Sequence, residues 1–375
     1  MIYLDNAATT YPKPEQVYIA LDTANRNAFN TGRGSYKCAR EASDIKEAVR
    51  EKILQLNNIK NGKVVYTSSA TMALNNLIFG INLKENDNVY ISPFEHNSII
   101  RPLEELKKRI RINIEILPFD KITWEPDYEK ISDMFALHNP SAIFLSQVSN
   151  VTGYLLPYNE IFKLSSIYNS INVLDAAQGY GVVSIDNRDN INYIVFAGHK
   201  SLYASFGIAG YIKLKDDVLK TNIFGGTGSD TMNPNMPNTI PDGYEAGSPN
   251  IVSIYGLNES ISWINSVNIF PHEKDLTDYL IDKLSKLKKV HMFLPDNKGK
   301  IFGVVSIGIA GYSSDDVGSI LDDEFGICVR TGYHCSPLVH DFLGTLEYNG
   351  TVRISLNYFN TKNDIDLLIT ALESL

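Results

Sequence analysis

The stretch Ile171-Asn-Val-Leu-Asp-Ala-Ala-Gln-Gly179, followed after a polar segment by Tyr193-Ile-Val-Phe-Ala-Gly-His-Lys200, decides the fold class. Each part is a short apolar run that ends in reactive polar groups: Asp175 closes the first, and His199 and Lys200 follow the second. Continuous apolar runs of this length are typical of buried parallel strands. The carboxyl ends of such strands face the crevice in which α/β proteins bind ligands. The sequence therefore predicts that a carboxylate and a lysine face one site.

A carboxylate and a lysine together suit a pyridine cofactor. The carboxylate of Asp175 would keep the ring nitrogen protonated, and the amine of Lys200 would form a Schiff base with an aldehyde on the ring. Taken as two isolated residues, they have an ordinary alternative, in which the aspartate caps a loop and the lysine lies on the surface. Residues elsewhere in the chain are needed to decide between the two.

Composition limits the class of protein. The chain has 375 residues, of which 44% are apolar and 21% charged, as expected of a globular protein with more than one domain. The net charge of −9 argues against binding to nucleic acid or to acidic membranes. No basic region precedes an apolar core at the N-terminus, and no apolar run is long enough to span a membrane. We expect a cytoplasmic protein.

Three cysteines, Cys38, Cys328 and Cys335, are too few and too scattered for a disulfide framework or a structural zinc site. We expect free thiols, as in a reducing compartment, and no metal. A metal site of His334, Cys335 and His340 matches no zinc spacing.

Strands that alternate with helices predict a doubly wound, mostly parallel sheet in an α/β fold. A helix is expected to begin near residue 15, a Gly-rich loop to cover residues 30–35, and further helices to lie at 45–56 and after residue 70. The expected strands are 63–67, 88–92, 142–146, 171–175, 193–197 and 207–212.

Polar residues follow three of these strands. Ser68-Ser-Ala-Thr71 leads from a strand into a helix, and free N–H groups at a helix start bind phosphate. The serines and threonine could equally be ordinary helix caps. His96 could stack on an aromatic cofactor and handle protons, or be an ordinary loop residue. Asn150 lies at the edge of the same crevice, or is simply a turn residue.

The segment 224–250 contains five Gly and four Pro, and long irregular segments of this kind are usually functional or disordered. Gly225-Gly-Thr-Gly228 could offer N–H groups to a phosphate, although it is not a dinucleotide fingerprint. We expect a large domain of residues 15–245, and a small α+β domain of residues 1–14 and 246–375. The latter should contain helices near 253–266, 273–287, 313–323 and after 361, and strands near 288–293, 302–308, 326–330 and 351–355.

Two candidate reactive residues lie in the small domain. Cys335 is in a loop bounded by Gly and Pro, near Arg330 and His334, where a cysteine can react as a thiolate or stay an inert thiol. Arg353 lies inside an apolar strand and needs an anionic partner, which is either a substrate carboxylate or a structural acid.

Taken in order along the whole chain, these motifs resemble the class V aminotransferases of pyridoxal phosphate (PLP) fold type I, specifically the cysteine desulfurase family. The motifs that carry the resemblance are Tyr3–Thr9, Ser68–Thr71, Glu95-His96, Ser149–Gly153, Asp175–Gln178, Gly198–Lys200, Tyr244–Asn250, Arg330–Cys335 and Arg353–Ser355.

The resemblance implies a PLP site whose ring, phosphate and reacting proton are held by the large domain. Lys200 would form the Schiff base and move the substrate α-proton, Asp175 would pair with the ring nitrogen, and His96 would stack on the ring. The other implied contacts are Gln178 to the ring oxygen, Asn150 to ring and substrate, Ala70, Thr71 and His199 to the phosphate, and Gly226 and Thr227 to the phosphate of the other subunit of a homodimer.

The resemblance also implies the reaction. Arg353, with Ala8 and Asn150, would bind the substrate L-cysteine, and Cys335 would take its sulfur as a persulfide. L-Alanine would be released, and the sulfur would pass to an acceptor protein. A selenocysteine lyase, and an aminotransferase or β-lyase on the same fold, are the alternatives, and a cofactor-free scaffold is a more distant one.

The chain departs from the family pattern at three places. Ala197 stands three residues before the lysine, where a serine or threonine usually contacts the phosphate. Leu202-Tyr-Ala-Ser-Phe206 replaces the usual turn of Gly and Pro. The loop that carries Cys335 is compact, which puts the sulfur acceptor in question more than the reaction.

Overall fold

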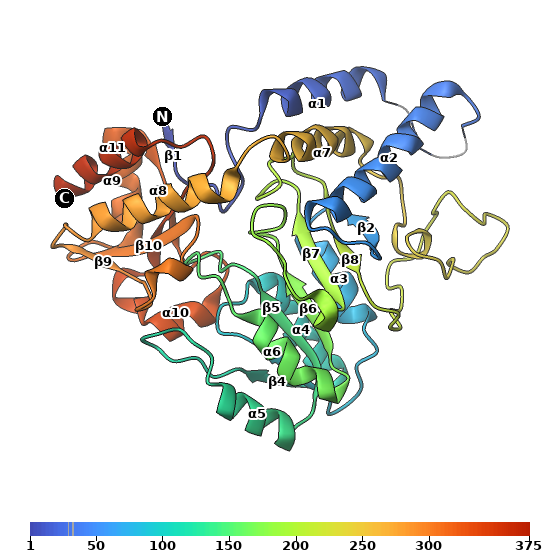
Figure 1. The fold of residues 1–375 in the computed structure, drawn as a ribbon, viewed down its shortest axis with the longest axis horizontal. Coiled ribbons are helices and arrows are strands. Elements are labelled where there is room, and N and C mark those ends of the chain that lie inside the picture. Colours follow the sequence, from blue (N-terminus) through green and yellow to red (C-terminus); the bar gives the residue numbers. More distant parts are fainter. Residues whose placement is uncertain (29, 32–33) are drawn as a thin grey trace.

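The computed structural model describes residues 1–28, 30, 31 and 34–375. The predicted Gly-rich loop at 30–35 therefore lies partly outside the described residues. A large layered unit with a central sheet lies beside a smaller unit built from the C-terminal third of the chain (Figure 1). Among the described residues, no helix has the length and apolar character needed to cross a membrane.

The central sheet has seven strands in the order β2-β8-β7-β6-β5-β3-β4. Five of them, from β7 to β4, run parallel, and β8 is antiparallel to both of its neighbours. The predicted α/β fold with a mostly parallel sheet is confirmed. The bounds are β2 Lys63–Thr67, β3 Asn88–Ile91, β4 Asn113–Ile116, β5 Pro140–Ser146, β6 Ile171–Asp175, β7 Tyr193–Ala197 and β8 Ala209–Lys213.

The central strands could be recognised in the sequence, because strands covered on both faces are continuous apolar runs. All five residues of β7 are buried, as are four of the five in β6. The edge strand β4 was not predicted, because Asn113-Ile-Glu-Ile116 is at most half-buried and gives no apolar run. The helices around this sheet are α1 Glu15–Asn27, α2 Lys37–Leu56, α3 Ala70–Gly80, α4 Asn97–Ile110, α5 Tyr128–Leu137, α6 Tyr158–Ser165 and α7 Ile251–Ile264.

Helix α7 follows the predicted domain boundary in sequence but shares the core of the large sheet. Its Ile254, Leu257 and Ile261 are fully buried in the same cluster as Leu174 and Ile194 of the sheet. Figure 1 shows α7 beside α1 and α2. The division at residue 245 stays a prediction.

The smaller unit has an antiparallel sheet of order β12-β13-β10-β9 and a separate parallel pair, β1 with β11. The prediction of a single strand at 326–330 is wrong, because this segment is divided between two sheets. After Gly326, which ends a helix with φ of 64°, Ile327 and Cys328 pair with the N-terminal strand, and Arg330–Gly332 then pair with β13. The strands are β1 Ile2–Tyr3, β9 Val290–Met292, β10 Val304–Ile309, β11 Ile327–Cys328, β12 Arg330–Gly332 and β13 Thr351–Ser355.

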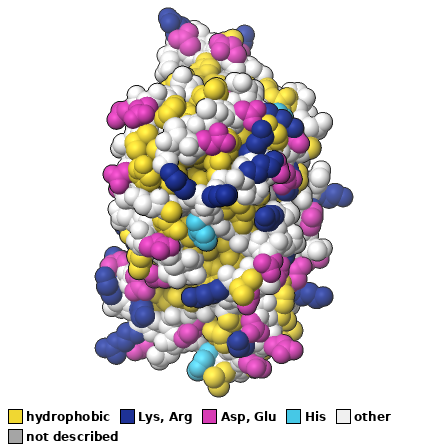
Figure 2. All heavy atoms as spheres, turned by 90° about the vertical axis from the view of Figure 1, so that its left-hand side faces the viewer, with side chains coloured by type: hydrophobic (Ala, Val, Ile, Leu, Met, Phe, Trp, Pro, Cys, Tyr) yellow, Lys and Arg dark blue, Asp and Glu magenta, His cyan; other side chains and the backbone are white. Residues whose placement is uncertain are grey.

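Four helices complete this unit: α8 Ile269–Leu284, α9 Ser314–Phe325, α10 Pro337–Leu343 and α11 Lys362–Glu373. The capping box predicted at Thr361 and Asp364 is present at the start of α11. On its outer face, positive and negative side chains are interspersed with apolar ones (Figure 2). Ion pairs such as Lys283–Asp366, at 2.8 Å, belong to this mixed surface.

Candidate active site

The predicted reactive residues lie at the carboxyl edge of the parallel strands. Asp175 is the last residue of β6 and is adjacent to Ser146, the last residue of β5. Its Oδ1 accepts the N–H of Ala177 at 3.0 Å. Burial raises the pKa of Asp175, and the Ala177 N–H and the nearby Lys200 oppose this shift. A carboxylate placed in this way is ready to pair with a cationic group, such as a protonated ring nitrogen.

Lys200 lies three residues beyond β7 and is largely enclosed. Burial lowers the pKa of Lys200 to about 8 and Arg353 acts in the same sense, whereas Asp175 and Cys335 oppose it. A lysine with such a pKa is partly neutral near neutral pH, so its amine can act as a nucleophile or as a base. Arg353 and Cys335, which belong to the smaller unit, thus influence the pKa of a lysine at the edge of the central sheet.

His96 caps the N-terminus of α4 with its ring. The Ser98 N–H donates to Nδ1 at 3.0 Å, so the proton of the neutral ring is on Nε2. Burial lowers the pKa of His96 to about 3, with further lowering by Lys200, Arg353 and Arg101. The ring is therefore neutral at physiological pH, as expected for a group that stacks on an aromatic cofactor.

Ser98 connects this histidine to the predicted phosphate site. Its hydroxyl lies 2.9 Å from Nδ1 of His96 and 2.8 Å from the hydroxyl of Thr71. Sequence reasoning did not single out Ser98. The available signal was its place two residues after His96, in the first turn of α4, where a serine can bond back to the helix start.

The predicted phosphate ligands Ala70 and Thr71 lie at the start of α3, and His199 lies two residues beyond β7. Ala70 and Thr71 are the first two residues of α3, whose N–H groups have no partner within a helix. Ser69 caps the helix by accepting the Met72 N–H at 3.2 Å. His199 stacks on Phe206 at 4.6 Å, and its buried Nδ1 has no hydrogen-bond partner among the described residues. Free helix N–H groups and an unpartnered buried ring nitrogen are each suited to bind a phosphate.

The N-terminal segment covers this edge of the sheet. The Thr10 N–H and the Thr9 hydroxyl both donate to the His199 carbonyl at 3.0 Å. The Gln178 amide donates to the Ala7 carbonyl, also at 3.0 Å. Ala8 therefore lies between two residues that are fixed to the ends of β6 and β7. This agrees with a position at the margin of the site.

Arg353 of β13 is 3% exposed and forms an ion pair with Asp5 at 2.7 Å. One terminal nitrogen donates to the Asn150 carbonyl at 3.0 Å. The buried Nε has no acceptor in the described part of the chain. The structure thus contains the internal acid that was one alternative for Arg353, and it also leaves one N–H available for a second anion.

Cys335 is exposed in a loop that is held on both sides. The Asn97 N–H, at the start of α4, donates to the Cys335 carbonyl at 2.7 Å. The Asn150 amide donates to the His334 carbonyl at 2.9 Å. Both His334 and Cys335 have positive φ, 47° and 57°. These two hydrogen bonds hold the backbone of the loop against the large domain, and the Cys335 side chain stays exposed.

Gly226 and Thr227 are not brought to this site by any hydrogen bond within the described residues. They line a hollow of about 400 Å³ that is formed by residues 224–237 alone. This segment, coloured olive in Figure 1, extends away from the sheet. No group of three or more His, Cys, Asp or Glu side chains that could hold a metal ion is found in the described part of the chain.

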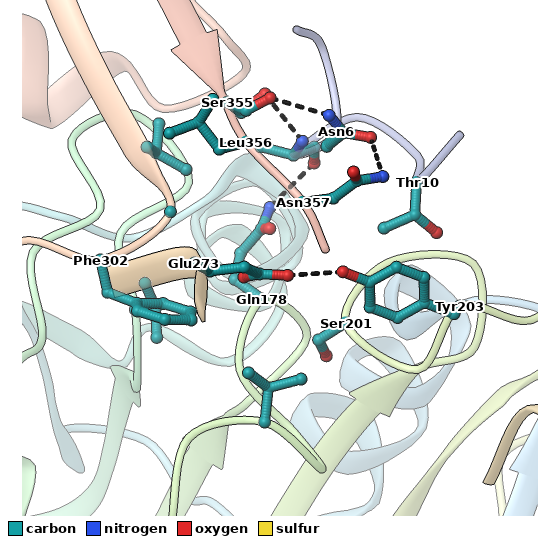
Figure 3. Close-up of a pocket in the computed structure, with 15 residues that line it drawn as sticks. Asn6, Thr10, Gln178, Ser201, Tyr203, Glu273, Phe302, Ser355, Leu356 and Asn357 are labelled. Atoms are coloured by element: carbon teal, nitrogen blue, oxygen red, sulfur yellow. Dashed lines mark hydrogen bonds between the residues drawn. The ribbon is translucent and has the colours of Figure 1, made fainter. Parts of the chain in front are cut away.

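A separate cavity of about 40 Å³ lies at the junction of the two domains (Figure 3). It is lined by Gln178 and Ser201 from the large domain and by Ser355 and Asn357 from the small one. Within it, the buried Glu273 accepts a hydrogen bond from Tyr203 at 2.5 Å. A polar cavity of this size holds water rather than a cofactor, so it belongs to the domain junction behind the site.

The chain has an α/β fold in which the predicted reactive residues lie in both the large and the smaller unit. The chain belongs to the aminotransferase class-V family, because the model of that family matches residues 2–368. It is 30% identical to a probable cysteine desulfurase of Halalkalibacterium halodurans, over all of this chain and 92% of the relative. It is 29% identical to a probable cysteine desulfurase of Methanothermobacter thermautotrophicus, over all of this chain and 94% of the relative.

Solved structures agree. The apo cysteine desulfurase of Thermococcus onnurineus superposes with a TM-score of 0.89 at 27% identity, covering 100% of this chain and 94% of that one. A cysteine desulfurase of Escherichia coli, in an S-sulfonic acid form, gives a TM-score of 0.82 at 26% identity, covering 99% and 94%. The predicted family and fold type are confirmed, and this family implies PLP.

Proposed function

We propose that this protein is a PLP-dependent cysteine desulfurase, which takes sulfur from L-cysteine as a persulfide on Cys335 and releases L-alanine. The observation that carries the proposal is the Cys335 loop. It holds the backbone of Cys335 against the start of α4 through the hydrogen bond from Asn97, and the side chain of Cys335 is exposed. Transamination alone needs no such nucleophile.

The residues of the site fit PLP. In this proposal Asp175 pairs with the ring nitrogen through its buried carboxylate, and Ala70, Thr71 and His199 hold the phosphate. When bound, PLP withdraws electron density from the substrate and so weakens its Cα–H and, after proton transfer, its Cβ–S bond.

The protein supplies the positioning and the proton transfers. Arg353 holds the substrate carboxylate through its free N–H, and the partly neutral amine of Lys200 takes the Cα proton. The Cys335 thiolate then attacks the substrate sulfur. A sulfur–sulfur bond forms as the Cβ–S bond breaks, and the electron pair of the broken bond stays on the carbon, which is protonated to become the methyl group of alanine.

We further propose a homodimer in which Gly226 and Thr227 reach the phosphate of the partner subunit. The segment that carries them projects from its own domain, and its Phe224 and Met232 are 73% and 95% exposed. Apolar side chains exposed to this degree suit a covered surface. A cytoplasmic location and an acceptor protein for the persulfide sulfur belong to the same proposal, which the free state of all three cysteines supports.

The test is mass spectrometry of the PLP-loaded protein after L-cysteine treatment. We expect one added sulfur atom on Cys335, removable by a thiol reductant, together with L-alanine. Cys335→Ala should keep the visible absorption of bound PLP and lose alanine formation, whereas Cys38→Ala, at another exposed thiol, should retain both.

Full alanine formation by Cys335→Ala would refute the role of the thiol. Pyruvate and ammonia from L-cysteine would identify a β-lyase instead. Turnover of selenocysteine, but not of cysteine, by the Cys335→Ala variant would identify a selenocysteine lyase.

A further inference from the structure

The side chain of Asn150 is hydrogen-bonded to the Cys335 loop through both its oxygen and its nitrogen. Its Oδ1 accepts the hydroxyl of Ser336 at 2.8 Å, and its Nδ2 donates to the His334 carbonyl at 2.9 Å. Ser336 is completely buried and Asn150 is 7% exposed, so neither hydrogen bond is exchanged readily for one to water. One amide from the large domain thus grips the residues on both sides of Cys335.

The loop needs such a grip because its backbone is strained. His334 and Cys335 are consecutive non-glycine residues with φ of 47° and 57°. Residues in this region persist only where surrounding contacts fix them. The other contacts of the loop include the Asn97 N–H to the Cys335 carbonyl at 2.7 Å, the Ser336 N–H to the Tyr333 carbonyl at 3.0 Å, and Nε2 of His334 to the Thr351 hydroxyl at 2.8 Å.

Asn150 also contacts the group that would hold the substrate. Its backbone carbonyl accepts a hydrogen bond from Arg353 at 3.0 Å. The loop with the thiol and the guanidinium for the carboxylate are therefore both fixed to one residue. A shift of the loop relative to Asn150 changes the distance from the thiol to a substrate held by Arg353.

We propose that Ser336 and Asn150 form a latch that positions the Cys335 thiol for attack. Ser336 is a positioning residue in this account, because its hydroxyl acts on the thiol only through Asn150 and the loop. The inference rests on the proposed function for its catalytic consequence. The structural part, that the hydroxyl of Ser336 holds the loop in place, can be measured without any turnover.

The test compares Ser336→Ala with Ser165→Ala in the PLP-loaded protein. Ser165 is also completely buried, and its hydroxyl is hydrogen-bonded to the amide of another asparagine, Asn172, at 3.0 to 3.1 Å. It lies at the end of α6, outside the proposed site. The two variants therefore remove the same kind of hydrogen bond, once inside the latch and once elsewhere.

Two quantities are measured. Hydrogen exchange followed by mass spectrometry should become about tenfold faster in Ser336→Ala for peptides that cover residues 333–337 and the Asn97 amide, as loss of a buried hydrogen bond predicts. The kcat for alanine formation should fall about tenfold, with KM for L-cysteine within about twofold, because Arg353 keeps its place. Ser165→Ala should leave both unchanged.

Faster exchange in the loop with unaltered kcat would refute the positioning role, and unaltered exchange would refute the latch itself. If Ser336→Ala does not fold, Asn150→Ala removes the same hydrogen bond from its other partner. Hydrogen exchange in residues 333–337 must then rise as expected for Ser336→Ala, and unaltered exchange would refute the latch. If the wild-type protein forms no alanine, the proposed function fails, while the exchange result still decides the latch.

Discussion

The large-domain and small-domain halves of the site are held together by different means. Asp175 is placed by the register of adjacent buried strands, since it ends β6 and pairs with Ser146 of β5 and Val195 of β7. Lys200 lies three residues beyond the end of β7. The backbone of Arg353 is likewise held in a sheet, between β10 and β12, but its guanidinium is oriented by single contacts to Asp5 and Asn150. The Cys335 loop is held by single hydrogen bonds to Asn97 and Asn150. The first half tolerates the loss of any one contact better than the second. We therefore expect substitutions at the domain junction to alter geometry, and substitutions at strand ends to alter chemistry.

The largest effect is expected at the strand-end lysine. Lys200→Ala should lower alanine formation by at least about 10³-fold, because no other amine is placed to move the proton. The absorption band of bound PLP should change as well. Lys213→Ala, at a buried lysine on the opposite edge of the sheet, should keep the band and most of the activity. Comparable activity of the two variants would contradict the assignment.

Substitutions of Asp5, which forms an ion pair with Arg353, test the small-domain half of the site. Asp5→Asn keeps an oxygen for Arg353 but removes the charge, so an unpaired buried cation should cost about 3–5 kcal/mol of stability without substrate. KM for L-cysteine should fall several-fold, because the substrate carboxylate no longer competes with Asp5. Asp5→Ala should instead raise KM, because Arg353 also loses its orientation. Thermal unfolding and steady-state kinetics measure both, and equal shifts in KM for the two variants would refute the argument.

Glu95, in the interior of the large domain, and Glu273, at the domain junction, are both buried. The pH dependence of stability can therefore be compared between the two regions. Glu95 accepts hydrogen bonds from the hydroxyls of Ser92 and Ser146 at 2.6 and 2.7 Å, and burial raises its pKa to about 7. Burial likewise raises the pKa of Glu273 to about 8. Each binds its proton more tightly when folded. Their contribution to stability is therefore complete below about pH 4.5 and is lost as pH rises through 7 or 8.

Replacing either carboxylate by glutamine should abolish its share of this pH dependence. For Glu95→Gln the effect is up to about 3 kcal/mol between pH 5 and 8. The variant should gain stability relative to wild type as pH rises from 5 to 8, because it has no carboxyl proton to lose. Thermal melts at several pH values check this, and parallel melting curves for wild type and variant would contradict it. Glu273→Gln should gain stability relative to wild type in the same way, but at higher pH, because the pKa of Glu273 is higher.

The smallest effect is expected at Ala197, which is 1% exposed at the end of β7. Ala197→Ser restores a hydroxyl where the family usually has one. We expect PLP to bind several-fold more tightly, equivalent to about 1 kcal/mol from one hydrogen bond. The cofactor-free protein should be less stable, because the buried hydroxyl then has no partner. PLP titration and thermal melts measure the two, and unchanged affinity would show that the phosphate lies elsewhere.

The same contrast explains what could be predicted from the sequence. The strands at 63–67, 171–175, 193–197 and 351–355 have the predicted bounds, because each is a covered apolar run. His96, Asp175 and Lys200 follow from strand ends in the same way. Strand β4 and the division of 326–330 into two strands were missed, because an exposed edge and a change of sheet leave no periodic pattern. Ser98 and Ser336 were missed because their partners, Thr71 and Asn150, are distant in sequence.

The N-terminal segment also determines when the site can form. Asn6 donates to the Ser355 carbonyl across 349 residues, Asp5 holds Arg353, and Thr10 donates to the carbonyl of Lys200. This segment leaves the ribosome long before β13 is made, so its residues have no partner in β13 until that strand has been synthesised. Contacts of such sequence separation form slowly, since loop closure precedes any gain from the contact. The central sheet can fold during synthesis, whereas the substrate-binding half is completed only after the last strand is released.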